Sequence, residues 1–169
     1  MAEIVEWKIQ LSELNYDEQE RIAVSNVLAD EWLTMGAKVN EFEKSFAQFL
    51  SNDTECVAVS SATAGLHLIL MAIGIEAGDE VILPGLTFVS DGNIIRQLGA
   101  NPVFADSEST NNFNASVDDI INKITSKTKA IIIVHFAGYP MFLEDLYNHC
   151  KSKNIVLIED VAHAPGSSV

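Results

Sequence analysis

The chain has 169 residues, of which 48% are hydrophobic and 20% charged, and its formal net charge is −14. This length and composition fit one globular domain with a hydrophobic core. The negative charge argues against nucleic acids and anionic membrane surfaces as partners, because both would repel the chain. The apolar runs are too short to span a bilayer, Met1–Gln10 lacks the pattern of a signal peptide, and Cys56 and Cys150 form no CxxC pair. We therefore expect a cytoplasmic protein.

The first 50 residues predict an arm followed by two helices. Residues 1–14 are expected to be an extended N-terminal arm. Asn15, with Glu18 three residues further on, is expected to cap a helix over Tyr16–Trp32. After a short loop, apolar residues recur at helical spacing and predict a second helix at about Val39–Leu50.

Beyond residue 52, short apolar runs alternate with helical segments. The predicted strands are Cys56–Ser60, Glu80–Leu83, Pro102–Ala105, Ala130–Val134 and Ile155–Ile158, and the predicted helices are Thr63–Ile73, Val89–Leu98, Ser116–Ile124 and Phe142–Lys153. Strand–helix alternation with short links indicates a three-layer α/β/α architecture with a mostly parallel, doubly wound sheet. About five strands are few for such a sheet, and the chain stops in a loop, so we expect the domain to continue after Val169.

Candidate functional residues lie where predicted strands end, because ligands of open parallel sheets bind beyond the carboxyl ends of the strands. The four loops concerned are Ser60–Thr63, Pro84–Phe88, His135–Pro140 and Glu159–His163. The first opens a helix, whose free backbone N–H groups suit a phosphate, although Ser61 or Thr63 would equally serve as a plain helix cap. Neither the dinucleotide fingerprint G-x-G-x-x-G nor the P-loop pattern is present.

The other three loops carry an aromatic residue, a histidine and a carboxylate. Phe88 could stack on a flat ligand or fill the core. His135 is interpreted as structural. Asp160 closes an apolar strand, with His163 three residues on. It could bind a metal with His163, pair with a protonated pyridine nitrogen, or cap a turn.

Eight segments in this order resemble one enzyme family. They are Trp32–Gly36, Val59–His67, Gly78–Ile82, Leu86–Ser90, Leu98–Val103, Thr128–Ile132, Val134–Gly138 and Ile158–Ala164. Together they resemble the pyridoxal-phosphate (PLP) dependent sugar-nucleotide aminotransferases of the DegT/StrS class, and most of all the UDP-4-keto-L-arabinose aminotransferases. The resemblance implies the large domain of PLP-dependent transferase fold type I, with residues 15–169 as its N-terminal part.

The resemblance also implies a cofactor, pyridoxal 5′-phosphate, and residues that hold it. The phosphate would lie at a helix start, the pyridine ring on an aromatic side chain, the ring nitrogen on a carboxylate and the phenolic oxygen near a histidine. In that order, the implied residues are Ala62, Thr63 and Ala64, then Phe88, then Asp160, then His163.

Substrates and partners follow from the same resemblance. Thr34 and Gly36 would belong to a loop that faces a nucleotide-linked keto-sugar, and glutamate would be the amino donor. Members of the family are homodimers with active sites at the subunit interface, so a second subunit is expected to complete the pocket.

One departure from the family concerns catalysis. The Schiff-base lysine of the family lies downstream of the segment that matches Ile158–Ala164, and none of the eight lysines of this chain stands in that context. No catalytic residue is therefore assigned, and the chain alone is expected to be inactive. Two alternatives stay open: a related PLP-dependent sugar dehydratase, in which a histidine replaces that lysine, and a truncated, non-catalytic binding or pairing protein.

Overall fold

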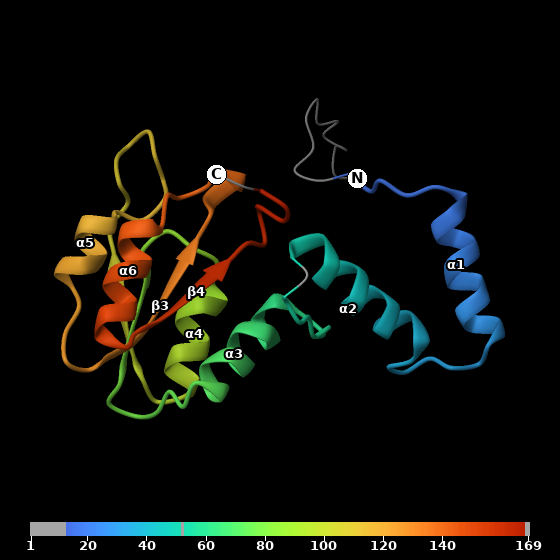
Figure 1. Ribbon diagram of the computed structural model, residues 1–169, viewed down its shortest axis with the longest axis horizontal. Helices are drawn as coiled ribbons and strands as arrows, with labels where there is room; N and C mark the ends of the chain where they lie inside the picture. Colours follow the sequence, from blue (N-terminus) through green and yellow to red (C-terminus); the bar gives the residue numbers. More distant parts are fainter. Residues whose placement is uncertain (1–12, 52, 168–169) are drawn as a thin grey trace, which may run out of the picture. The chain divides into compact units, whose positions relative to one another are not determined.

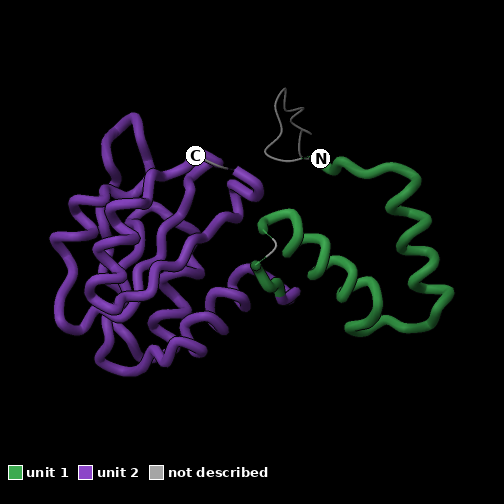
Figure 2. The backbone as a smooth tube through the Cα atoms, in the orientation of Figure 1, with its two compact units in different colours: residues 1–56 green, residues 57–169 purple. Residues whose placement is uncertain are grey.

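The structure is a computed structural model that describes residues 13–51 and 53–167. The chain divides into two compact units, residues 1–56 and 57–169 (Figure 2). The first unit contains helices α1 (Glu18–Ala29) and α2 (Ala37–Leu50). Most of the arm expected over residues 1–14 lies outside the described residues.

The cap of α1 differs from the one expected at Asn15. The N-cap is Asp17, whose carboxylate accepts the N–H of Gln19 at 2.7 Å, while Glu20 accepts the N–H of Asp17, also at 2.7 Å. The prediction of Asn15 with Glu18 was wrong because the same motif recurs two residues later. There Asp17 and Glu20, three residues apart, form a capping box in which each side chain accepts a backbone N–H near the other residue.

The second unit contains a four-stranded, wholly parallel sheet, and helices connect its strands along the chain (Figure 1). The strand order is β2-β1-β3-β4. In chain order, the elements are α3 (Ala62–Ala72), β1 (Glu80–Pro84), α4 (Val89–Gln97), β2 (Asn101–Ala105), α5 (Val117–Asn122), β3 (Thr128–Val134), the 3-10 turn η1 (Phe136–Gly138), α6 (Glu144–Lys153) and β4 (Val156–Asp160). The predicted doubly wound parallel sheet is confirmed.

The strand predicted at Cys56–Ser60 is absent. These residues carry no strand assignment, and the ladders of the described chain join only β1 to β2, β1 to β3 and β3 to β4. An apolar, β-branched run becomes a strand only where a neighbouring backbone offers a continuous ladder. Val57 instead is 77% exposed.

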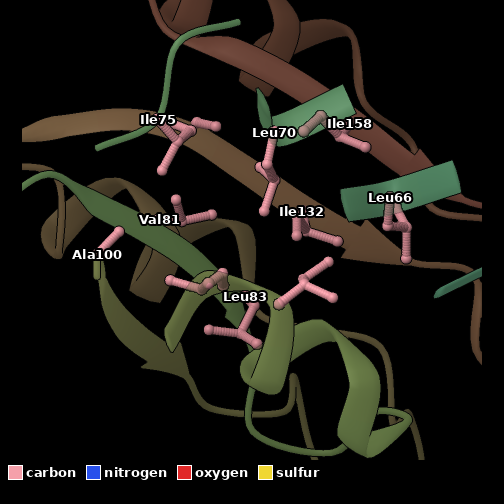
Figure 3. Close-up of a cluster of buried hydrophobic side chains, with 11 residues drawn as sticks. Leu66, Leu70, Ile75, Val81, Leu83, Ala100, Ile132 and Ile158 are labelled. Atoms are coloured by element: carbon pink, nitrogen blue, oxygen red, sulfur yellow. The ribbon is translucent and has the colours of Figure 1, made fainter. Parts of the chain in front are cut away.

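Side chains that alternate along the strands build a core on each face of the sheet. Val81 and Leu83 of β1 pack with residues of α3 and α4, whereas Ile82 between them packs with residues of α5 and α6. On β3, Ile132 likewise belongs to the first core and Ile131 to the second. Figure 3 shows the first core, in which helix residues Leu66 and Leu70 meet strand residues. The three-layer α/β/α architecture is thereby confirmed.

The parallel register brings functional loops to one edge of the sheet. Val134 at the end of β3 lies opposite Asp160 at the end of β4, and β1 ends at Pro84 beside β3. The chain then leaves each strand on the same side. Within the residues that the structure describes, no helix combines the length and apolar character needed to cross a bilayer.

Helix α3 supplies a matched test of the core. Leu70 is fully buried, whereas Leu68 on the same helix is 53% exposed. We expect Leu70→Ala to lower the free energy of unfolding by about 2–5 kcal/mol through lost burial and a cavity, and Leu68→Ala by less than about 1 kcal/mol. Urea unfolding midpoints measure both, and equal midpoints would contradict this packing.

Candidate functional site

A cavity of about 410 Å³ lies at the carboxyl edge of the sheet in the second unit. Its walls come from the start of α3, the loop between β1 and α4, the end of β3 and the loop after β4. The lining residues are Ser61, Ala62, Thr63, Thr87, Phe88, Ser90, Val134, Phe136, Asp160, Ala162 and His163. This volume suits a small-molecule ligand, and the walls combine apolar surface with a few polar groups.

One wall is the N-terminus of α3. Ser61 is the N-cap, and its Oγ accepts the N–H of Ala64 at 3.1 Å. The N–H groups of Ala62 and Thr63 precede the first intrahelical hydrogen bonds, so they are available to an anion. The geometry at this wall therefore fits a phosphate group.

A second wall is formed by the first turn of α4 and the loop before it. Phe88 is the N-cap of α4, and its side chain is 69% exposed, which leaves a face of the ring open to a flat ligand. Beside it, the hydroxyl of Thr87 donates to Oδ2 of Asp91, and the hydroxyl of Ser90 donates to Oδ1 at 3.2 Å.

Asp91 is fully buried in this wall. Burial raises the pKa of its carboxyl above the ordinary 3.8, and the negative charge of Asp160 raises it further, while the hydrogen bonds from Thr87 and Ser90 lower it. The carboxylates of Asp91 and Asp160 therefore repel one another electrostatically.

Asp160 is the last residue of β4 and is partly buried. Its Oδ1 accepts the N–H of Ala162 at 2.9 Å, which fixes the carboxylate in a tight turn. Among the described residues no donor reaches its other oxygen, Oδ2, so this atom can accept a hydrogen bond from a ligand.

His163 is held by the turn after β3. The N–H of Ala137 donates to Nδ1 of His163 at 3.1 Å, so the proton of the neutral imidazole is assigned to Nε2. Ala137 adopts a left-handed conformation with φ of 54°, and the Phe136 ring packs edge-on against the imidazole at 5.9 Å. His163 therefore presents a hydrogen-bond donor.

Asn114, a residue that the sequence did not single out, fixes that turn. Its side chain is buried, accepts the N–H of Phe136 at 2.8 Å and donates to the carbonyl of Tyr139 at 2.9 Å. An asparagine in a polar turn is too common for its sequence position alone to reveal such a role.

His135 is buried and fully engaged. Its Nδ1 accepts the N–H of Met141 at 3.1 Å, and its Nε2 lies 2.9 Å from Oε2 of Glu159. These contacts fit the structural role expected for His135. Among residues 13–51 and 53–167, no group of three or more potential metal ligands occurs.

Most of the cofactor residues expected from the sequence meet in the cavity. Ala62, Thr63, Phe88, Asp160 and His163 all line it. The backbone N–H of Ala64, which was expected beside them, is bound to Ser61 instead. Thr87 and Phe136 lie in two of the predicted loops, although no role was assigned to them, whereas Ser90 and the buried Asp91 lie outside those loops. An acidic residue three positions after the stacking aromatic was the available signal for Asp91.

The expected substrate residues Thr34 and Gly36 belong to the first unit. They line a hollow of about 510 Å³ between α1 and α2. The indole N–H of Trp32 donates to the carbonyl of Met35 at 3.1 Å, and a Cβ on Gly36 would lie 2.5 Å from Cδ1 of Trp32. A side chain at position 36 would therefore have to displace the indole ring of Trp32.

Comparison with known proteins gives the class and then the family. The fold is that of PLP-dependent aminotransferases, and the chain belongs to the DegT/DnrJ/EryC1/StrS aminotransferase family, which matches residues 15–169. Members of this enzyme family use PLP as their cofactor. The chain spans about two fifths of the length of the solved structures that it resembles.

Three solved structures illustrate the likeness. The aminotransferase TlmJ from Streptoalloteichus hindustanus is 36% identical with a TM-score of 0.86, over 92% of this chain and 42% of that one. An aminotransferase from Psychrobacter cryohalolentis is 32% identical with a TM-score of 0.83, over 91% and 39%. A GDP-4-keto-6-deoxymannose-3-dehydratase, solved with a trapped PLP-glutamate geminal diamine, is 25% identical with a TM-score of 0.86, over 94% and 42%.

The buried carboxyl of Asp91 generates a pH prediction for the ligand-free chain. The pKa of this carboxyl is raised in the folded state, so its protonated form stabilises the folded chain fully at pH values below 3.8. This stabilisation is lost as the pH rises through the pKa that the carboxyl has in the folded state. Asp91→Asn removes the buried charge, so the variant should unfold a few degrees above the wild type at pH 7.

The matched control is Asp118→Asn, which removes an exposed carboxylate from the first turn of α5. Thermal unfolding between pH 4 and 8 should show the advantage of Asp91→Asn growing with pH and no such trend for Asp118→Asn. Parallel curves for the wild type and Asp91→Asn would refute the assignment.

Proposed function

We propose that this chain forms the PLP cradle of an aminotransferase that acts on a nucleotide-linked keto-sugar, with glutamate as the amino donor. The observation that carries the proposal is the polarity of the cavity. The backbone N–H groups of Ala62 and Thr63 lie in one wall of the cavity, and the carboxylate of Asp160, a hydrogen-bond acceptor, lies in another wall. PLP has the same polarity, with an anionic phosphate and a basic ring nitrogen.

Each part of the cofactor has a chemically suitable protein group in the cavity. The helix N-terminus would bind the phosphate through N–H groups and the helix dipole. The exposed face of Phe88 would support the pyridine ring, and Oδ2 of Asp160 would accept a hydrogen bond from the N–H of the protonated ring. The Nε2–H of His163 would donate to the phenolic oxygen.

These contacts have a chemical purpose. Bound PLP supplies an electron sink for the carbon that carries the transferred amino group. Asp160 keeps the proton on the ring nitrogen, because a carboxylate beside a cation favours its charged form. The tight turn at Ala162 orients that carboxylate, and the ring of Phe88 would shield one face of a bound cofactor from water.

Substrate, assembly and location follow as part of the proposal. The family and the likeness to a sugar aminotransferase from Streptococcus pneumoniae, Spr1654, support a sugar aminotransferase. The matching sequence segments, taken together, favour UDP-4-keto-L-arabinose as the acceptor. We infer that residues 15–169 are the N-terminal part of the large domain, that Thr34 and Gly36 contact the nucleotide-sugar, and that the enzyme is a cytoplasmic homodimer.

A second candidate is a PLP-dependent sugar dehydratase. The similarity to the GDP-4-keto-6-deoxymannose-3-dehydratase, with a TM-score of 0.86, favours it. Both reactions would use the same cradle, so Asp160, Phe88 and the start of α3 would keep their roles. The residue that binds the cofactor covalently distinguishes them.

Pyridoxamine 5′-phosphate tests the cradle, because it needs no covalent attachment to bind. We expect the wild-type chain to bind it and Asp160→Asn to weaken binding by about 10- to 100-fold, which corresponds to one hydrogen bond to a charged group. Fluorescence titration of the ligand measures the dissociation constants. Glu159→Gln is the matched control: it removes one carboxylate at the neighbouring position, outside the cavity lining. Equal affinities of the wild type and Asp160→Asn would refute the role of Asp160.

The 169 residues alone should not catalyse transamination. None of the described residues that line the cavity is a lysine, and a lysine is the group that the family uses for attachment and proton transfer. Incubation of the purified chain with PLP, glutamate and UDP-4-keto-L-arabinose should yield no 2-oxoglutarate above a no-enzyme blank. Sustained 2-oxoglutarate formation would contradict the prediction.

A further inference from the structure

Asp91 is a buried ionisable group to which the proposed chemistry gives no role. It lies in the first turn of α4, and its side chain is fully buried. A buried carboxylate is costly unless it is paired with a cation or well hydrogen-bonded. Among the described residues, its carboxylate oxygens contact two hydroxyls and no lysine, arginine or histidine.

Those two hydroxyls belong to residues of the cavity wall. Thr87 and Ser90 both line the cavity, and each donates to Asp91. A hydroxyl has one proton and two lone pairs, so a hydroxyl that donates to Asp91 can only accept from a ligand. The buried carboxylate thereby decides which kind of hydrogen bond this wall offers.

Charge reinforces the same polarity. Asp160 is the charged group that acts on Asp91, so two carboxylates share this end of the cavity, and none of the described lining residues is a lysine or an arginine. A ligand that brings a positive charge to this end would satisfy both carboxylates. The phosphate-binding donors of α3 form a separate wall.

We propose that Asp91 is a positioning residue for the cofactor: it holds the hydroxyl oxygens of Thr87 and Ser90 as acceptors and adds a second negative charge to that of Asp160, so that the cavity selects a protonated pyridine ring. This inference rests on the proposed function, since it requires PLP or its amine form in this cavity. It assigns Asp91 no contact with the reacting atoms.

The competing explanation is purely structural. An aspartate in the first turn of a helix also stabilises the helix dipole, and its bond to Thr87 ties the preceding loop to α4. Such a role would affect stability and loop order, but it would leave the protonation state of a bound ring unchanged. The test therefore needs a readout on the ring nitrogen.

The experiment uses pyridoxamine 5′-phosphate labelled with 15N in the ring, because the 15N chemical shift reports whether the nitrogen carries a proton. The 15N shift is followed from pH 6 to pH 10 with the ligand bound to the wild type, Asp91→Asn and Asp118→Asn, so that the protonation of the ring is compared where it changes. The first variant is isosteric, and the second removes an equal charge from an exposed first-turn position.

We expect the wild type and Asp118→Asn to hold the ring protonated. In Asp91→Asn the ratio of protonated to neutral ring should fall on the order of tenfold, the effect of removing one nearby charge from a partly buried site. The NH2 of the new amide would also donate to one of the two hydroxyls, Thr87 or Ser90, and would turn the proton of that hydroxyl toward the cavity and against the ring N–H.

The other outcomes each overturn a defined claim. Equal ring protonation in Asp91→Asn and Asp118→Asn would overturn the role of Asp91 while leaving the cofactor site intact. An Asp91→Asn chain that fails to fold would also overturn it, because the charge would then serve the fold. A wild-type chain that binds no pyridoxamine 5′-phosphate would overturn the proposed function and this inference together.

Discussion

The parallel pairing of β3 with β1 and β4 is the constraint on which the cavity depends. Because all four strands run in one direction, their carboxyl ends meet at one edge, and the loops that follow β1, β3 and β4 converge there. The register that sets Val134 opposite Asp160 fixes the height of the carboxylate at that edge. Buried β-branched residues such as Ile131 and Ile132 hold this register from both faces, since a shift by one residue would exchange the two cores.

The same edge carries polar groups that weaken the fold while they shape the site. Asp91 is buried without a cation, and its pKa is raised, so it reduces the stability of the ligand-free chain at neutral pH. Ala137 holds a left-handed conformation that suits glycine better, and its N–H fixes the imidazole of His163. Such features are expected where a protein prepares a ligand site, because the ligand supplies the missing partner.

Sequence reasoning succeeded where local patterns decide the structure. The continuous apolar run Ala130–Val134 is typical of a strand covered on both faces, and it lies within β3. The helix predicted over Ser116–Ile124 contains α5. Sequence reasoning failed at Cys56–Ser60, because strand formation there depends on a neighbour and not on composition. It also missed Asp91 and Asn114 as parts of the site: the direction of a hydroxyl proton and the closure of a distant turn depend on contacts that spacing does not encode.

The central claim is that the cavity orients PLP with its phosphate on α3 and its ring nitrogen on Asp160. A crystal structure of the chain with pyridoxamine 5′-phosphate tests it most directly. The account predicts a ring nitrogen within hydrogen-bonding distance of Oδ2 of Asp160, about 2.7–3.2 Å, and phosphate oxygens on the N–H groups of Ala62 and Thr63. A ligand bound outside this cavity, or bound with its phosphate toward Asp160, would contradict it.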